Sequence, residues 1–147
     1  MVDNGTAEKN CKKVMEGDVD TVILLIGHGS PRPEGRAEFY ALADLLRAEA
    51  GGRPVETAFL STGSPNVATA IDRLAARGAR RIVLCPCLLF AGNHVCRELP
   101  AVIRDAGRRH SGVELLLAEP MGVHAKLAQV LFERCAPALG DEPKSEA

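Results

Sequence analysis

The stretch LLIGHGSPRP (residues 24–33) runs from a fully apolar segment directly into a histidine that lies between two glycines. The apolar run 21–26 has the length and composition of a buried strand. An ionisable imidazole, His28, follows at the point where that strand is predicted to end. The sequence therefore predicts a titratable group at the end of a buried strand. Its function depends on which other residues the fold brings near it.

Apolar runs of strand length alternate with apolar stripes at helical spacing along the chain. Strands are predicted at 21–26, 55–60, 80–85 and 113–117, and the stripes include Leu42 and Leu46, Ile71 and Leu74, Val102 and Ile103, and Val123 and Leu127. Uniformly apolar strands that alternate with amphipathic helices are typical of a parallel sheet with helices on both faces. Right-handed crossovers then predict a three-layer α/β/α fold with a four-stranded parallel sheet of order 2-1-3-4.

The composition indicates one globular domain. The chain has 147 residues, of which 46% are hydrophobic and 25% charged, with a net charge of −1. We expect a single domain at 21–137 between flexible tails at 1–20 and 138–147. The charge balance predicts no nucleic-acid partner, and the apolar runs are too short to cross a membrane. Because the polar N-terminus lacks a hydrophobic signal core, a cytoplasmic location and free thiols are expected.

Two histidines are predicted to meet at one edge of the sheet. Ligands of such sheets bind beyond the carboxyl ends of the strands, where the strand order reverses. His28 follows the first strand and His94 lies in the loop after the third. A pair of neutral imidazoles suits Co²⁺, Fe²⁺, Ni²⁺ or Zn²⁺. A histidine at a strand end also caps loops, so both interpretations of His28 stay open at this stage.

The remaining histidines and thiols are weaker candidates. His110 lies near a helix end, where a solvated cation is favourable, and His124 is expected at the surface or in packing contacts. Cys85 belongs to the apolar end of the third strand and is expected in the core. Cys87 and Cys96 lie in or beside the loop of His94, which leaves a soft-ligand or redox function open.

Four segments together resemble a known family. They are LLIGHGSPRP (24–33), AFLSTGSPNVATAI (58–71), IVLCPCLLFAGNHVCRELP (82–100) and EPMGVH (119–124), in that order. They resemble the class II tetrapyrrole chelatases, specifically the short form of sirohydrochlorin cobaltochelatase. The resemblance spans about residues 21–135, and its most specific part is the Gly-x-His of the third segment with the acidic-x-Pro that follows.

This resemblance implies a chelatase-like fold and a homodimer, because the short form is similar to half of the two-domain chelatases. It implies insertion of Co²⁺, with Fe²⁺ or Ni²⁺ as alternatives, into sirohydrochlorin, a macrocycle with eight carboxylates. His28 and His94 match the metal-binding histidines, and Glu98 is a candidate proton acceptor. Candidate substrate-binding residues are Ser30, Arg32, Arg36, Gly92 and Arg97, since guanidinium groups bind carboxylates in bidentate fashion.

Insertion requires no nucleotide, in keeping with the absence of a Gly-x-x-x-x-Gly-Lys loop from the sequence.

Two positions depart from the family pattern. Relatives commonly carry a glutamate where this chain has Ser61, and Asp-Ile-Pro where it has Glu98-Leu99-Pro100. The first departure favours an alternative, a metal or tetrapyrrole carrier without catalysis. A histidine phosphatase is the third hypothesis, although Gly27 occupies the position where such enzymes place an arginine.

Overall fold

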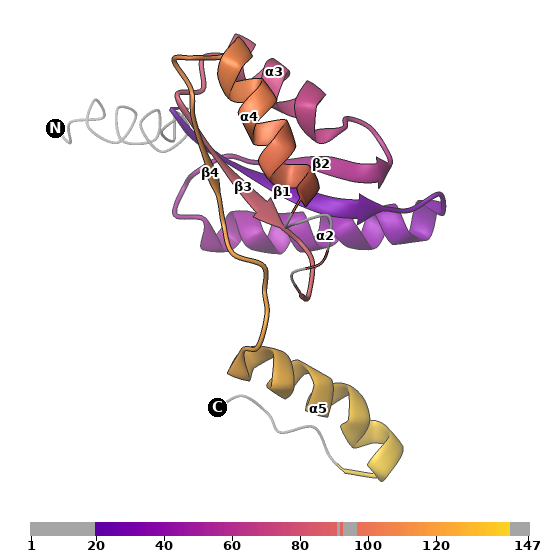
Figure 1. Ribbon diagram of the computed structural model, residues 1–147. Helices are drawn as coiled ribbons and strands as arrows, with labels where there is room; N and C mark the ends of the chain where they lie inside the picture. The colour runs from indigo at the N-terminus through magenta and orange to yellow at the C-terminus, as the bar shows by residue number, and fades with distance from the viewer. Residues whose placement is uncertain (1–19, 91, 93–96, 142–147) are drawn as a thin grey trace, which may run out of the picture.

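The computed structural model describes residues 20–90, 92 and 97–141, and strands alternate with helices throughout this part of the chain (Figure 1). The apolar runs that the sequence offers as strands all form strands, and the apolar stripes form helices. The elements are β1 (Thr21–Gly29), α2 (Pro33–Glu49), β2 (Val55–Thr62), α3 (Val67–Ala76), β3 (Arg81–Pro86), α4 (Leu99–Arg109), β4 (Glu114–Leu117) and α5 (Ala125–Leu139).

The four strands form one parallel sheet in the order β2-β1-β3-β4, which confirms the predicted topology. Ile23 of β1 pairs with Val55 on one side and with Val83 on the other, and Val83 in turn pairs with Leu116 of β4. The strand order reverses between β1 and β3. The carboxyl ends of these two strands therefore flank the predicted ligand-binding position.

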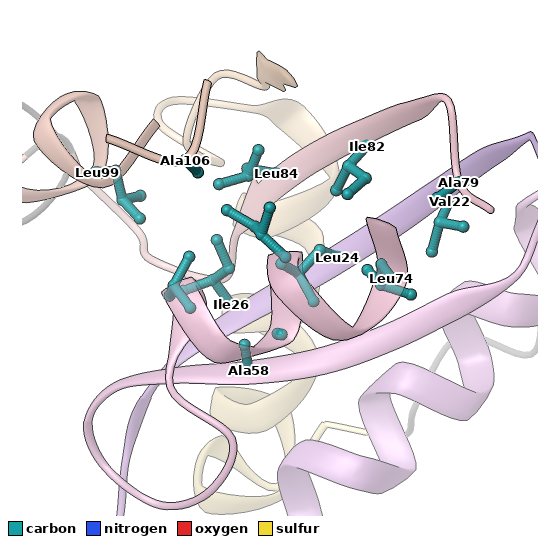
Figure 2. Packing of buried hydrophobic residues seen from close by; sticks show 13 residues of the cluster. Val22, Leu24, Ile26, Ala58, Leu74, Ala79, Ile82, Leu84, Leu99 and Ala106 are labelled. Atoms are coloured by element: carbon teal, nitrogen blue, oxygen red, sulfur yellow. The ribbon is translucent and has the colours of Figure 1, made fainter. Parts of the chain in front are cut away.

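Helices α3 and α4 cover one face of the sheet, and α2 covers part of the other (Figure 1). Because side chains of a strand alternate between faces, Val22, Leu24 and Ile26 of β1 point toward α3 and α4. There they pack with apolar side chains of β2, β3 and both helices, among them Ala58, Leu74, Ile82, Leu84, Leu99 and Ala106 (Figure 2). The core on the side of α2 is smaller and contains Leu25, Ala43, Ala50 and Val55.

Helix α5 departs from the expected three layers. It lies apart from the sheet at the end of an extended linker (Figure 1), and Ala136 is its only buried residue. The helix begins at Ala125, where His124 Nδ1 accepts a hydrogen bond from the backbone N–H of Lys126. Val123, which we predicted in the apolar stripe of this helix, precedes it and is 99% exposed. Of the helices in the described part of the chain, α2, α3 and α4 thus cover the predicted sheet, and α5 does not.

Two predicted boundaries also shift. Strand β1 continues to Gly29, because Gly29 still pairs with Thr62 of β2, so His28 lies within the strand and not beyond it. Helix α5 extends to Leu139, into the region predicted as a tail. Most of both predicted tails falls outside the described residues. None of the helices in the described part of the chain is long and apolar enough to span a membrane. The cytoplasmic location stays a prediction.

Candidate active site

A cavity of about 190 Å³ opens at the carboxyl end of β1. Its walls come from the end of β1, the loop that follows it, the start of α2, and residues of β2 and the segment after β3. The lining residues are Gly27, His28, Gly29, Ser30, Gly35, Arg36, Phe39, Phe59 and Cys87. The cavity thus lies where the strand order reverses, and His28, Ser30 and Arg36 of the predicted site line it.

His28 is exposed on the cavity wall, as the second-to-last residue of β1. The segment after β3 runs alongside it, because the backbone N–H of Cys87 donates a 2.7 Å hydrogen bond to the carbonyl oxygen of Ile26. Cys87 therefore faces the same cavity as the imidazole. An exposed imidazole beside a thiol provides two ligands of the kind that borderline divalent metals bind.

The glycines at this end of β1 are needed for contacts within the protein. A Cβ on Gly27 would lie 2.8 Å from the Phe39 ring, and a Cβ on Gly35 would lie 2.8 Å from Ser30 Oγ. Gly29 has φ of +102°, and a Cβ there would lie 1.9 Å from the carbonyl oxygen of Thr62. The structure shows that Gly27 and Gly29 let an aromatic ring and a neighbouring strand approach.

Arg36 holds the loop that follows His28. Its Nη1 atom donates hydrogen bonds to the carbonyl oxygens of Ser30, at 3.0 Å, and Pro31, at 3.2 Å. Ser30 Oγ accepts a 3.2 Å hydrogen bond from the backbone N–H of Arg32. Arg36 is half-buried against the cavity, whereas Arg32 is exposed at the residue that precedes α2. Of these two arginines, Arg36 is the one placed to meet a ligand in the cavity.

An aromatic cluster forms the apolar wall of the cavity. The ring centroids of Phe39 and Phe59 lie 5.2 Å apart with a tilted geometry, and Tyr40 lies 6.2 Å from Phe59. Tilted and edge-to-face pairs are favourable arrangements of aromatic rings. The sequence predicts the strand that contains Phe59, but it gives no sign that Phe39 and Phe59 both line the site.

Burial keeps the nearby thiols protonated. Desolvation raises the pKa of Cys85 above its usual value, and desolvation together with the adjacent Cys85 raises that of Cys87. Cys85, which we expected in the core, is half-buried and packs against the core beside α2. A thiol binds metal as the thiolate, so metal binding by Cys87 would release a proton to solvent or to a base.

The loop after β3 leaves part of the predicted site untested. His94 and Cys96 lie outside the described residues, whereas Gly92, Arg97 and Glu98 are described and exposed, with Glu98 directly before α4. Among the residues that the structure describes, no three histidine, cysteine or acidic side chains gather into a metal site. The convergence of His28 with His94 stays a prediction.

The two other histidines have structural contacts elsewhere. His110 ends α4 at the amino edge of the sheet, where its Nε2 lies 2.6 Å from Asp72 Oδ1. Arg109 donates a 3.2 Å hydrogen bond to the same oxygen. The hydrogen bond from His110 is the main reason that the pKa of Asp72 is lowered. His110 thus joins an ion-pair cluster, where we predicted a solvated cation, and His124 caps α5.

The fold and the cavity together define an α/β protein of the chelatase-like class, with a histidine at the switch point of a 2-1-3-4 sheet. The family model CbiX matches residues 22–138, and the chain belongs to this family. The chain is 32% identical over 123 residues to a sirohydrochlorin cobaltochelatase from Sulfurisphaera tokodaii, covering 84% of this chain and 98% of that protein. The match over residues 22–138 confirms the family that the sequence motifs suggested.

Longer relatives match over about half of their length. A chloroplastic sirohydrochlorin ferrochelatase from Arabidopsis thaliana is 30% identical over 118 residues, which cover 80% of this chain and 52% of that protein. The crystal structure of the sirohydrochlorin chelatase SirB from Bacillus subtilis subspecies spizizenii in complex with cobalt has a similar fold, with a TM-score of 0.73 and 24% identity. That match covers 78% of this chain and 49% of the SirB chain.

Proposed function

We propose that this protein is a sirohydrochlorin chelatase that inserts a divalent metal, with Co²⁺ as the first candidate and Fe²⁺ or Ni²⁺ as alternatives. The observation that carries the proposal is His28, exposed in a cavity at the switch point of the sheet with Arg36 beside it. Relatives of similar identity are named for cobalt and for iron, which supports the reaction class and leaves the metal to experiment.

Metal insertion involves three tasks that the candidate site residues can perform. The metal must lose water, and a neutral imidazole such as that of His28 holds a partly dehydrated ion and later releases it. The macrocycle must lose two pyrrole protons, which His94 and Glu98 are proposed to accept. Carboxylates on the macrocycle are proposed to bind Arg36, Arg32 and Arg97, together with Ser30 and Gly92.

The size of the cavity favours a homodimer. About 190 Å³ is less than the roughly 300–1,000 Å³ of typical ligand pockets, and a tetrapyrrole is a large ligand. One copy of the chain therefore provides one wall, and we propose that a second copy provides the other. The match to about half of each longer relative supports this arrangement, since two copies would equal the length of one such protein.

The test is an anaerobic insertion assay that follows the absorbance of sirohydrochlorin with Co²⁺, Ni²⁺ and Fe²⁺ in parallel. We expect the wild-type protein to accelerate insertion of at least one metal and His28→Ala and His94→Ala to abolish it. His110→Ala is the matched control, because that imidazole lies at the opposite edge of the sheet and bonds Asp72. Wild-type rates in both site variants would overturn the assignment.

A carrier without catalysis is the second candidate, favoured by Ser61. This residue is exposed at the carboxyl end of β2, where the family resemblance of the sequence leads us to expect a glutamate. Position 61 therefore supplies no anionic metal ligand or proton acceptor. The same assay separates the candidates, because a carrier binds metal or tetrapyrrole in equilibrium titrations and leaves the insertion rate at the level of the uncatalysed reaction.

A further inference from the structure

One half of the sheet face on the side of α2 has no helix over it. Helix α2 packs against β1 and β2, while Val83 and Cys85 of β3 and Leu116 of β4 lie on the same face beyond it. Val83 and Cys85 are half-buried, and Leu116 is 41% exposed. We call these three residues the open face. Cys85 borders the core on the side of α2, whereas Val83 and Leu116 belong to neither cluster of buried residues. Parallel sheets are normally covered on both sides, so this part of the sheet lacks a covering helix among those described.

Helix α5 in turn has an apolar side that no other element covers in the described part of the chain. Most of its apolar side chains gather on one side, where Arg134 lies among them, and Lys126, Gln129 and Glu133 lie on the other. Yet Leu131 is 67% exposed and Phe132 is 53% exposed, so the apolar side meets solvent. A helix of this length gains most of its stability from packing such a side against another element. Both an apolar helix and an apolar sheet face are therefore present in one chain without contacting each other.

The linker between β4 and α5 directs the helix away from its own sheet. The backbone N–H groups of Met121 and Gly122 donate hydrogen bonds to the carbonyl oxygens of Leu88 and Leu89, at 3.2 and 2.6 Å. Leu88 and Leu89 follow β3, so these bonds hold the linker beyond the carboxyl edge of the sheet. Helix α5 then continues outward from this point (Figure 1).

We propose that two copies of this chain exchange their α5 helices, each covering the open face of the other. The exchange is reciprocal, so it closes as a two-fold symmetric dimer. The linker leaves the sheet at the edge that carries His28, so the helix reaches the second copy across the cavity edge. The inference rests on the homodimer proposed above and specifies how that dimer is held together.

The exchanged helices contribute part of the area that a stable dimer needs. A helix of 15 residues is about 22 Å long and about 10 Å wide, so covering one side removes roughly 400 Å² of its surface from water. The open face loses less, because Val83 and Cys85 are already half-buried and Leu116 is 41% exposed. The two helix contacts therefore bury less than a standard interface of about 1,600 Å², and contacts between the copies around the cavity complete it.

The test measures mass in solution by sedimentation. We expect the wild-type protein at twice the chain mass of 15.6 kDa. Leu131→Asp, on the apolar side of α5, and Leu116→Asp, on the open face, should each shift it to the single-chain mass. Gln129→Asp is the matched control on the polar side of the same helix and should stay dimeric. Far-UV circular dichroism checks folding, and Leu116→Ser replaces L116D if that variant does not fold.

Mixing the two variants distinguishes exchange of α5 between chains from packing of α5 on the sheet of its own chain. An L131D chain keeps an intact open face and an L116D chain keeps an intact helix, so an exchanged pair contains one complete contact and should regain dimer mass. Mixed chains that stay monomeric would overturn the exchange. Dimers in both separate variants would overturn it and leave the homodimer intact, and a monomeric wild type would overturn both. Insertion activity is measured separately, so failure of the chelatase proposal is distinguishable.

Discussion

Replacing Gly29 with alanine places a methyl group against the backbone of Thr62 in β2. The new Cβ would lie 1.9 Å from the carbonyl oxygen of Thr62, and about 1.5 Å of strand movement is needed to reach ordinary contact at 3.4 Å. Such a movement disrupts the end of the ladder, at about 1 kcal/mol for each lost hydrogen bond. The positive φ of +102° adds strain of about 1–2 kcal/mol.

The expected total for Gly29→Ala is about 3 kcal/mol of unfolding free energy, or roughly 10 °C in the melting temperature of a domain of this size. Gly78→Ala is the matched control, because Gly78 has a similar φ of +97° and nothing within 4 Å of its added Cβ. It should lose only about 1–2 kcal/mol in chemical denaturation. Equal losses in the two variants would refute the claim that the strand contact, and not the dihedral angle, requires glycine.

Three further predictions concern charge and metal. Asp72→Asn should destabilise the protein above about pH 4 and have little effect at lower pH, because the His110 hydrogen bond lowers the pKa of Asp72 in the folded state. Replacing Cys85 and Cys87 with alanine should reduce the loss of stability above about pH 9, since burial raises both thiol pKa values and folding disfavours the thiolates. Ser61→Glu should tighten Co²⁺ binding about tenfold in calorimetric titrations, by adding an anionic ligand.

Each of these has a contradicting result. Denaturation curves of Asp72→Asn that differ from wild type equally at pH 3 and pH 7 would show that the carboxylate charge is irrelevant. An unchanged alkaline loss of stability without the two thiols would place its origin in other groups. Weaker Co²⁺ binding by Ser61→Glu would show that the exposed end of β2 does not face the metal.

The sheet could be predicted because hydrophobic patterning reports directly on burial. Strand β1 is apolar at every position from Val22 to Ile26, and the structure divides these side chains between two cores. Only a strand with helices on both sides buries consecutive residues in this way. Connection rules then leave few sheet orders, and the observed β2-β1-β3-β4 is the simplest of them.

The details of the cavity could not be predicted, because they depend on contacts between distant segments. The sequence shows that Gly29 allows a positive φ, but the neighbour at Thr62 is set by the register of β1 and β2. Similarly, periodicity indicates that Phe39 is buried without indicating that it packs on Phe59 beside His28. The ion pair of His110 with Asp72 also joins two helices whose relative placement no local pattern encodes.

Helix α5 shows what an amphipathic pattern leaves undetermined. The stripe that includes Leu127 and Leu131 indicates that a helix forms and that one side seeks apolar contacts, but it does not say which chain supplies them. The cavity at His28 is likewise too small for a macrocycle on its own. If one partner copy corrects both deficiencies, assembly and metal insertion are linked by mass action. The rate of insertion per chain should then fall on dilution through the dimer dissociation constant, and by more in Leu131→Asp than in Gln129→Asp.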